Sequence, residues 1–392
     1  MVKTATMYTY DLDDAERALA EVKNQLKNQV ELMKNTVGIL ICDPEFVKSG
    51  VAKTICAGLP FPIAGMTSVA QSVSGEVGRL LLTLMVLTSD DVFFAVGTSA
   101  TASNKGDVFA NAELPYAQAA GRLGAKPEMI MLFSPFSLGT PGNIYVDAFS
   151  VLCPDVPVFG AFAMDDLPKF TDCLTISNGS ASEDAIAFIL IGGNVAPRFF
   201  ITNVSEEKMA CAHSKITKCR GNVLMEVNGA LAVDHFTKFG LAKGGALAAG
   251  LRFLLLAMDR EKRKGPDDPP ILNEVCYFDQ SGFAICQEDL SANSTFEVAI
   301  FPNEYILGTS QNLIEKLNAA QPIQAIIMFS CAARRLSLRN EPLAELYLVA
   351  ETVSRGTPYM IACTGGEICP VPDGAGALVN RFHNYALIAC IL

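Results

Sequence analysis

Polar side chains that can recognise a small molecule gather near the end of the chain. Cys331 and Arg334 follow a short apolar run that predicts a buried strand, and Gly366 and Glu367 follow the next such run. Groups at the end of a buried strand are held rigidly and can face a cleft. The planar fork of Arg334 suits a carboxylate and Glu367 suits an ammonium group, which predicts a site for a zwitterion such as an amino acid. The alternative is that these two charged residues pair with each other.

Cys331 also raises the possibility of thiol chemistry. A thiol beside Arg334 and Arg335 can have a lowered pKa, and His383 can act as its base. A free cysteine is more often a small buried hydrophobe, and nothing in the sequence brings His383 within hydrogen-bond reach of it. We therefore expect no enzyme and keep a thiol-dependent enzyme as an alternative.

Metal and cofactor sites have little support in the sequence. The chain has three histidines, too scattered for a metal cluster, and twelve cysteines without a Cys-x-x-Cys pair. This cysteine usage is typical of reduced thiols in a cytosolic protein. No metal and no cofactor is predicted, although a single histidine can ligate a haem iron.

The elements that must position these residues recur three times along the chain. Buried strands are predicted at residues 37–41, 129–133 and 325–329, each followed by a turn, a helical stretch and a second strand. The carboxyl ends of such strands are where open α/β sheets place ligands. In the third unit this edge includes the polar cluster described above.

Other segments complete a fold prediction of two tandem α/β domains, built from repeated strand-turn-helix-strand units with mixed sheets. An amphipathic helix is expected within residues 1–33, a domain at 34–235 and a second domain at 236–392. The apolar run 244–258 predicts a buried helix, and the charged, proline-rich run 259–270 predicts a surface loop. Three short runs at 275–278, 282–286 and 295–301 favour an antiparallel meander in the C-terminal half.

Composition limits the partners. The net charge of −11 repels phosphate backbones and anionic membranes, so neither nucleic acid nor a membrane is expected as a partner. No secretory signal is evident, and the most apolar run is too short to span a bilayer. We expect a cytoplasmic protein.

Several motifs resemble the FIST domains. FSCAAR at 329–334, TGGEICP at 364–370 and FHN at 382–384 resemble the FIST C-terminal domain, and PVFGAFAMDD at 157–166 with ISNG at 176–179 resembles the FIST N-terminal domain. The resemblance implies an intracellular sensory protein that binds a small ligand such as an amino acid. It also implies signalling through a separate partner, such as a kinase or receptor, and some family members are haem-containing nitric oxide sensors. Matched by motif, the candidate ligand-binding residues are Cys331, Arg334, Glu367, Asn384, Gly160 and Asp165, beside Gly366.

Overall fold

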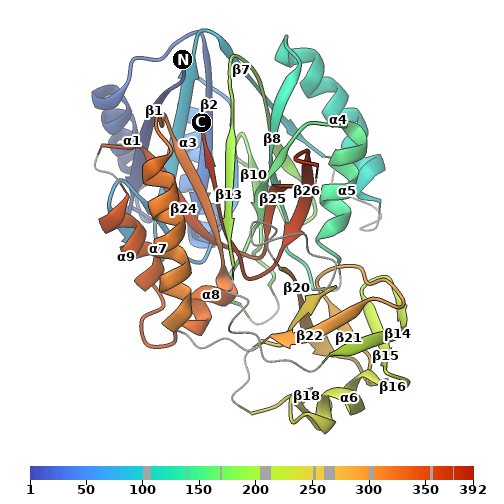
Figure 1. Ribbon diagram of the computed structural model, residues 1–392. Helices are drawn as coiled ribbons and strands as arrows, with labels where there is room; N and C mark the ends of the chain where they lie inside the picture. The colour runs from blue at the N-terminus through green and yellow to red at the C-terminus, as the bar shows by residue number, and fades with distance from the viewer. Residues whose placement is uncertain are drawn as a thin grey trace.

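The computed structural model describes residues 1–99, 107–138, 140–167, 170–203, 213–249, 253–259, 270–299, 304–353, 356–373 and 375–392. These residues form a large α/β body and a smaller β-barrel, which lies below the body in Figure 1. Both chain termini lie at the opposite end of the body from the barrel.

The body is built from three units with the same order of elements. The first contains β1 (Lys3–Thr9), α1 (Ala15–Gln29), β2 (Asn35–Cys42), α2 (Pro44–Lys48), α3 (Val51–Gly58), β3 (Ile63–Thr67), β4 (Gln71–Val73), β5 (Glu76–Gly78) and β6 (Leu82–Ser89). The second contains β7 (Val92–Thr98), α4 (Val108–Leu123), β8 (Pro127–Ser134), α5 (Asn143–Leu152), β9 (Val158–Phe162), β10 (Thr175–Ser177), β11 (Ser180–Ser182) and β12 (Ala187–Gly193). The third contains β13 (Arg198–Thr202), α7 (Glu304–Ala319), β23 (Ile326–Cys331), α8 (Ala332–Ser337), α9 (Ala344–Thr352), β24 (Tyr359–Thr364), β25 (Glu367–Pro372), β26 (Leu378–His383) and β27 (Leu387–Ile391).

Each unit lends a hairpin to the sheet of another unit. The three sheets have the strand orders β1-β6-β2-β3-β10-β11, β7-β12-β8-β9-β25-β26 and β13-β27-β23-β24-β4-β5. In every sheet the two central strands of the unit are parallel, and the borrowed hairpin joins antiparallel to the second of them. The exchange is cyclic, so the three units form a closed ring.

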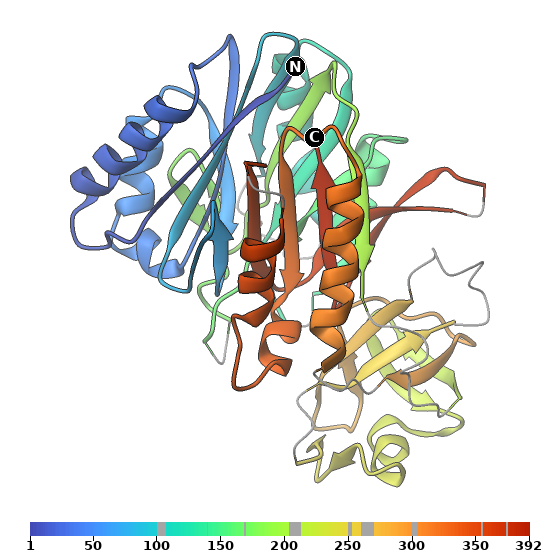
Figure 2. The same cartoon turned by 60° about the vertical axis from the view of Figure 1, so that its left-hand side comes forward.

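Alternation along the strands divides the apolar side chains between two cores. In β2, Ile39 and Ile41 face the common core between the sheets, whereas Leu40 packs with α1 and α3 on the outer face. Helices cover the outer faces of the sheets, as Figure 2 shows for α1, α3, α7 and α9. The inner faces meet around aromatic rings, with the ring centroids of Phe133 and Phe329 6.4 Å apart.

The barrel is an insertion in the third unit, between β13 and α7. Its strands pair in the order β14-β22-β19-β20-β21-β15, and β14 also pairs with β15, which closes the sheet. They are β14 (Ser214–Arg220), β15 (Val223–Val227), β19 (Leu255–Met258), β20 (Ile271–Phe278), β21 (Ala284–Cys286) and β22 (Thr295–Ala299), accompanied by β16 (Ala230–Leu231), α6 (Ala232–Lys238), β17 (Ala242–Lys243) and β18 (Ala246–Leu247). The expected domain boundary between residues 235 and 236 lies inside α6, and barrel strands come from both sides of it.

The predicted fold class is confirmed. The strands predicted at 37–41, 129–133 and 325–329 are present and buried. Of the three runs predicted to form an antiparallel meander, β20 and β21 pair with each other, whereas β22 joins the barrel between β14 and β19. Each unit, however, begins one strand and one helix earlier than predicted. Among the described helices, none is both long and apolar enough to cross a bilayer.

The buried helix predicted at 244–258 is wrong. Gly244 and Gly245 take φ values of +61° and +80° in the turn between β17 and β18, and β19 follows. A short apolar run does not distinguish a buried strand from a buried helix, and paired glycines favour a turn. Residues 250–252 of this run, and 260–269 of the predicted surface loop, lie outside the described residues.

Candidate functional site

The main cavity, of about 430 Å³, lies where the carboxyl ends of β9, β23 and β24 meet the barrel. The body contributes Phe136, Leu138, Met164, Asp165, Asp166, Leu167, Phe170, Cys331, Ala332, Ala333, Leu336, Thr364 and Gly365. The barrel and the segment leading into β19 contribute Phe253, Glu274, Cys276 and Gln287. The strand ends predicted to carry the site therefore do line a cavity, but the barrel supplies another of its walls.

Glu274 is the charged group of the main cavity that has no protein partner. It lies on β20, and its carboxylate makes no hydrogen bond or ion pair with any described residue. Burial raises the pKa of this carboxyl to about 7. The described residues that line the cavity include no lysine, arginine or histidine. This wall favours a ligand that carries a positive charge or donates hydrogen bonds.

Cys331 lines the main cavity, but it is not an activated thiol. Its residue is only 4% exposed, and burial together with the nearby carboxyls of Glu367 and Glu274 raises the pKa of the thiol well above its usual value. The thiol-enzyme alternative required a lowered pKa, and the shift has the opposite direction. His383 is occupied elsewhere, because its Nε2 donates to the Cys369 carbonyl at 3.0 Å. Burial lowers the pKa of His383 to about 4.

Arg334 does not reach a ligand cavity. It is fully buried, and its Nη2 lies 2.7 Å from Oε1 of Glu345 on α9. The same nitrogen donates to Ser310 Oγ at 3.0 Å and to Thr309 Oγ1 at 3.1 Å, both on α7. The role of gripping a ligand carboxylate is thus incompatible with its position. Its partner is Glu345, which was not predicted from the sequence, and not Glu367, the partner in the alternative interpretation. The feature of the sequence that pointed to Glu345 is its position directly before Leu346, an apolar residue that is buried in α9.

Glu367 is equally withdrawn from the cavity. Its Oε1 accepts from Thr364 Oγ1 at 2.9 Å, and its Oε2 accepts from the Ala386 amide at 3.3 Å. Burial raises the pKa of this carboxyl well above its usual value. A buried carboxyl whose two oxygens accept from Thr364 and Ala386, and which does not line the main cavity, is not the ammonium partner predicted from the sequence.

Asn384 connects the body to the barrel. Its Nδ2 donates to the Leu272 carbonyl at 3.0 Å and to Oε1 of Glu288 at 3.4 Å. Burial raises the pKa of Glu288 to about 8. Asn384 is therefore a positioning group that helps to fix one wall of the main cavity.

The two candidate glycines are packing positions. A Cβ atom at Gly160 would lie 1.8 Å from the carbonyl oxygen of Leu132 on the neighbouring parallel strand. Gly366 has φ +152°, and a Cβ atom there would lie 2.6 Å from the ring of Phe382. Close approach of backbone and ring, not of a ligand, explains both.

Asp165 lines the main cavity and organises its loop. Its Oδ1 accepts from the Leu167 amide at 2.8 Å, and its Oδ2 accepts from the Asp172 amide at 2.5 Å. Next to it, Asp166 is held by Arg335, whose Nη1 lies 3.0 Å from Oδ1, and by Arg79. Among the seven candidate residues, Cys331 and Asp165 line the main cavity. Glu274, which lines the cavity together with Cys276 from β20, was not predicted from the sequence.

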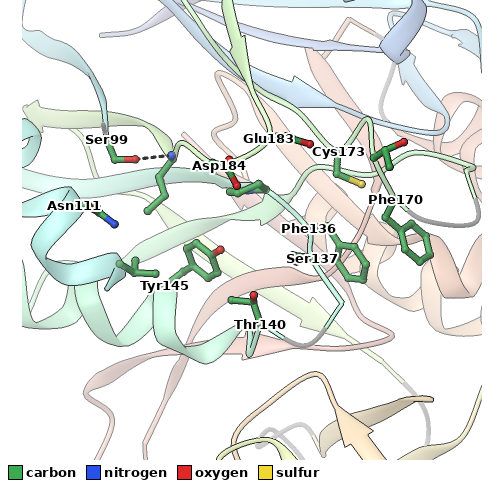
Figure 3. A pocket seen from close by; sticks show the side chains of 14 residues that line it. Ser99, Asn111, Phe136, Ser137, Thr140, Tyr145, Phe170, Cys173, Glu183 and Asp184 are labelled. Atoms are coloured by element: carbon green, nitrogen blue, oxygen red, sulfur yellow. Dashed lines mark hydrogen bonds between the residues drawn. The ribbon is translucent and has the colours of Figure 1, made fainter. Parts of the chain in front are cut away.

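A second cavity, of about 240 Å³, lies beyond the end of β8 (Figure 3). Its lining residues are Ser99, Val108, Asn111, Pro135, Phe136, Ser137, Thr140, Tyr145, Phe170, Thr171, Cys173, Glu183, Asp184 and Ile186. Phe136 and Phe170 line both cavities and pack edge to face, with ring centroids 5.1 Å apart. This aromatic pair is the wall shared by the two cavities.

Comparisons with known proteins identify the sequence families. Residues 36–230 match the FIST N domain, and residues 237–370 match the FIST C domain. No curated protein matches the sequence. Among solved structures, a cyanuric acid hydrolase from A. caulinodans is similar at 10% identity and a TM-score of 0.38, covering 100% of this chain and 99% of that chain. A chorismatase is similar at 8% identity and a TM-score of 0.37, covering 100% of this chain and 98% of that chain.

Proposed function

Because the chain belongs to the FIST family, whose domains are small-ligand-binding sensory domains of signal transduction, we propose that its ligand occupies the main cavity. The observation that supports this proposal is the unpartnered carboxylate of Glu274 in a cavity of about 430 Å³ between the barrel and the body. A cavity of this size with few polar groups is typical of small-molecule sites.

The chemistry of the walls selects the ligand class. Phe136, Met164 and Leu336 offer apolar surface, and Glu274 offers a charge-assisted acceptor. These groups suit a small molecule with an ammonium group and an apolar part, such as an amino acid or a related amine. In this proposal the partner of the ammonium group is Glu274, and not Glu367 as predicted from the sequence. The Arg334 guanidinium does not bind a ligand carboxylate.

The position of the cavity suggests how a ligand would produce a signal. Its walls come from both the body and the barrel, so a bound ligand contacts both and favours one arrangement of the two. A cytoplasmic signalling protein, such as a kinase or receptor supplied in trans, then reads that arrangement. In this role the chain binds its ligand without transforming it.

The two alternatives have less support from the geometry. For a haem-based gas sensor the sequence offered a histidine as the axial ligand, and the described residues that line the two cavities include no histidine. A thiol-dependent enzyme needs a thiolate at neutral pH, whereas burial raises the pKa of Cys331.

Native mass spectrometry of freshly purified protein tests the proposal by showing any retained small molecule. Thermal-shift titration then compares amino acids with the matching acids that lack the amino group, for the unmodified chain and Glu274→Gln. We expect stabilisation by compounds with the amino group only, weakened in the variant, with the compound recovered unchanged. Consumption of the compound would establish an enzyme, and equal stabilisation by the matching acids would refute the role of Glu274.

A further inference from the structure

The second and third units can be superposed element by element in their topology. β8 ends with the Phe-Ser step Phe133-Ser134, and β23 contains the same step, Phe329-Ser330, one residue before its end. The helices α4 and α5 of the second unit correspond to α7 and α9 of the third, and β12 corresponds to β27. The strand register extends this match, because Ala187 lies opposite Phe133 and Ile388 lies opposite Phe329. Asp184 and Tyr385, each three residues earlier, are therefore counterparts.

In the third unit the space between these elements is occupied by a guanidinium group. Arg334 donates to Thr309 and Ser310 on α7, to Glu345 on α9 and to the Tyr385 carbonyl before β27. The guanidinium thus has a hydrogen-bond acceptor on each of the three surrounding elements. Arg334 is the fourth residue after Ser330, the serine of the Phe-Ser step.

In the second unit the corresponding elements surround the second cavity. Val108 and Asn111 on α4, Tyr145 on α5 and Asp184 before β12 line it, as Figure 3 shows for the last three. The residue four positions after Ser134 is Leu138, which lines the main cavity instead. The second unit therefore has the same surrounding elements, but no arginine side chain occupies the space between them as Arg334 does in the third unit.

We infer that the second cavity is a binding site for a small organic cation of the guanidinium type, which takes the place that the Arg334 side chain takes in the third unit. This inference goes beyond the proposed function, because it concerns a different cavity and does not depend on the main one being occupied.

Tyr145 supplies an independent observation at the site. The residue is only 7% exposed, it lines the cavity, and its hydroxyl has no hydrogen-bond partner among the described residues. The hydroxyl oxygen is not fully enclosed by the protein, so it is accessible from the cavity and available to a ligand. Burial and the negative charge of Asp184 together raise the pKa of Tyr145 to about 12, so the hydroxyl stays neutral and can accept from an N–H donor.

The charges around the second cavity agree with a cation. Asp184 lines the cavity and Glu183 lies exposed at its edge, whereas the described lining residues include no lysine, arginine or histidine. A planar guanidinium presents five donors, which suits a carboxylate, a phenol hydroxyl and the Asn111 side-chain oxygen arranged around one space.

The test uses methylguanidinium as the probe and its neutral isostere methylurea as the control compound. Calorimetric titration of the full chain should detect methylguanidinium and not methylurea. Asp184→Asn and Tyr145→Phe should each weaken methylguanidinium binding, the former by about tenfold or more, because a charge-assisted contact is lost. Glu351→Gln, which removes an exposed charge on α9, should leave the affinity unchanged.

Three outcomes overturn the inference. Equal binding of methylurea would show that charge is not recognised, and unchanged affinity in both Asp184→Asn and Tyr145→Phe would place the probe elsewhere. Loss of methylguanidinium binding in Glu274→Gln, with binding kept in Asp184→Asn, would assign the probe to the main cavity. This last result would leave the proposed function intact, so the two proposals fail separately.

Discussion

The Nη2 atom of Arg334 lies 2.7 Å from Oε1 of Glu345, with both side chains almost completely buried. Ser310 and Ser330 also donate to the carboxylate of Glu345, so neither charge is left without hydrogen bonds. The pair holds α7, α8 and α9 together. A buried charge whose partner is removed is strongly destabilising, so this pair belongs to the stability of the third unit.

Arg334→Met should therefore reduce the free energy of unfolding, by about 3–5 kcal/mol. The double variant Arg334→Met/Glu345→Leu should be less destabilised, because it leaves no uncompensated buried charge. Urea unfolding followed by circular dichroism measures both. Ligand affinity of the folded Arg334→Met protein should stay near that of the unmodified chain. Normal stability combined with lost affinity would return Arg334 to the ligand site.

Glu274→Gln and Glu367→Gln form a matched pair of carboxyl variants. The first removes the unpartnered charge of the main cavity and should lower affinity for an amine ligand by about ten- to a hundredfold. The second replaces a carboxyl that does not line the main cavity and should change affinity little. Calorimetric titration decides between them, and the reverse order of effects would contradict our assignment of the site.

The pH dependence of stability should carry the signature of Glu274. Its pKa rises from 4.5 to about 7 on folding, so between these values the folded state holds a proton that the unfolded state has released. The free energy of unfolding should hence fall as the pH rises through this window, and the contribution present below pH 4.5 is lost above about pH 7. Denaturant midpoints across this range should show a shallower fall in Glu274→Gln. An identical slope in the variant would mean that this carboxyl has its ordinary pKa.

Cys331 should resist alkylation in the folded protein. Its thiol is buried and its pKa is raised, so little thiolate is present at neutral pH. Iodoacetamide labelling followed by peptide mass spectrometry should find Cys331 unmodified under native conditions and modified in urea. Rapid native labelling at this residue would revive the enzyme alternative.

Gly160→Ala should strongly destabilise the protein, because the added methyl group would meet the Leu132 carbonyl oxygen on the adjacent strand. Gly121→Ala is the matched control, since nothing lies within 4 Å of a Cβ atom at that helical position. The control should stabilise the protein by about 0.5–1 kcal/mol. Thermal unfolding compares the two, and a stable Gly160→Ala protein would contradict the packing role.

Strong local patterns made part of the fold predictable. β2, β8 and β23 are continuous apolar runs, and they could be identified together with the threefold repeat. The hairpin exchange could not be predicted, because β4, β5, β10 and β11 have only three residues each and their partners lie in other units. In so short a strand, pairing is set by tertiary contacts and not by periodicity.

The site was predictable only where position along a strand determined it. Cys331 is the last residue of β23 and Asp165 lies shortly after β9, and both line the main cavity because the ends of these strands meet at one edge. Arg334 and Glu367 are only a few residues away from the strand ends that line the cavity, but both side chains are buried elsewhere. Their burial depends on partners such as Glu345, which the spacing in the sequence does not reveal. Glu274 reaches the cavity from the barrel, and no local pattern says where an inserted barrel packs.

The cyclic exchange of hairpins also fixes an order of assembly during synthesis. The β4–β5 hairpin leaves the ribosome early, but it pairs with β24, where Val73 lies opposite Met360. Until that late strand emerges, the nascent first unit carries an unpaired hairpin, and such edges invite pairing with other chains. Closing contacts between segments so distant in sequence is intrinsically slow. The body can therefore be completed only after the third unit has been synthesised. A chain truncated before β24 would lack the strand with which the β4–β5 hairpin pairs.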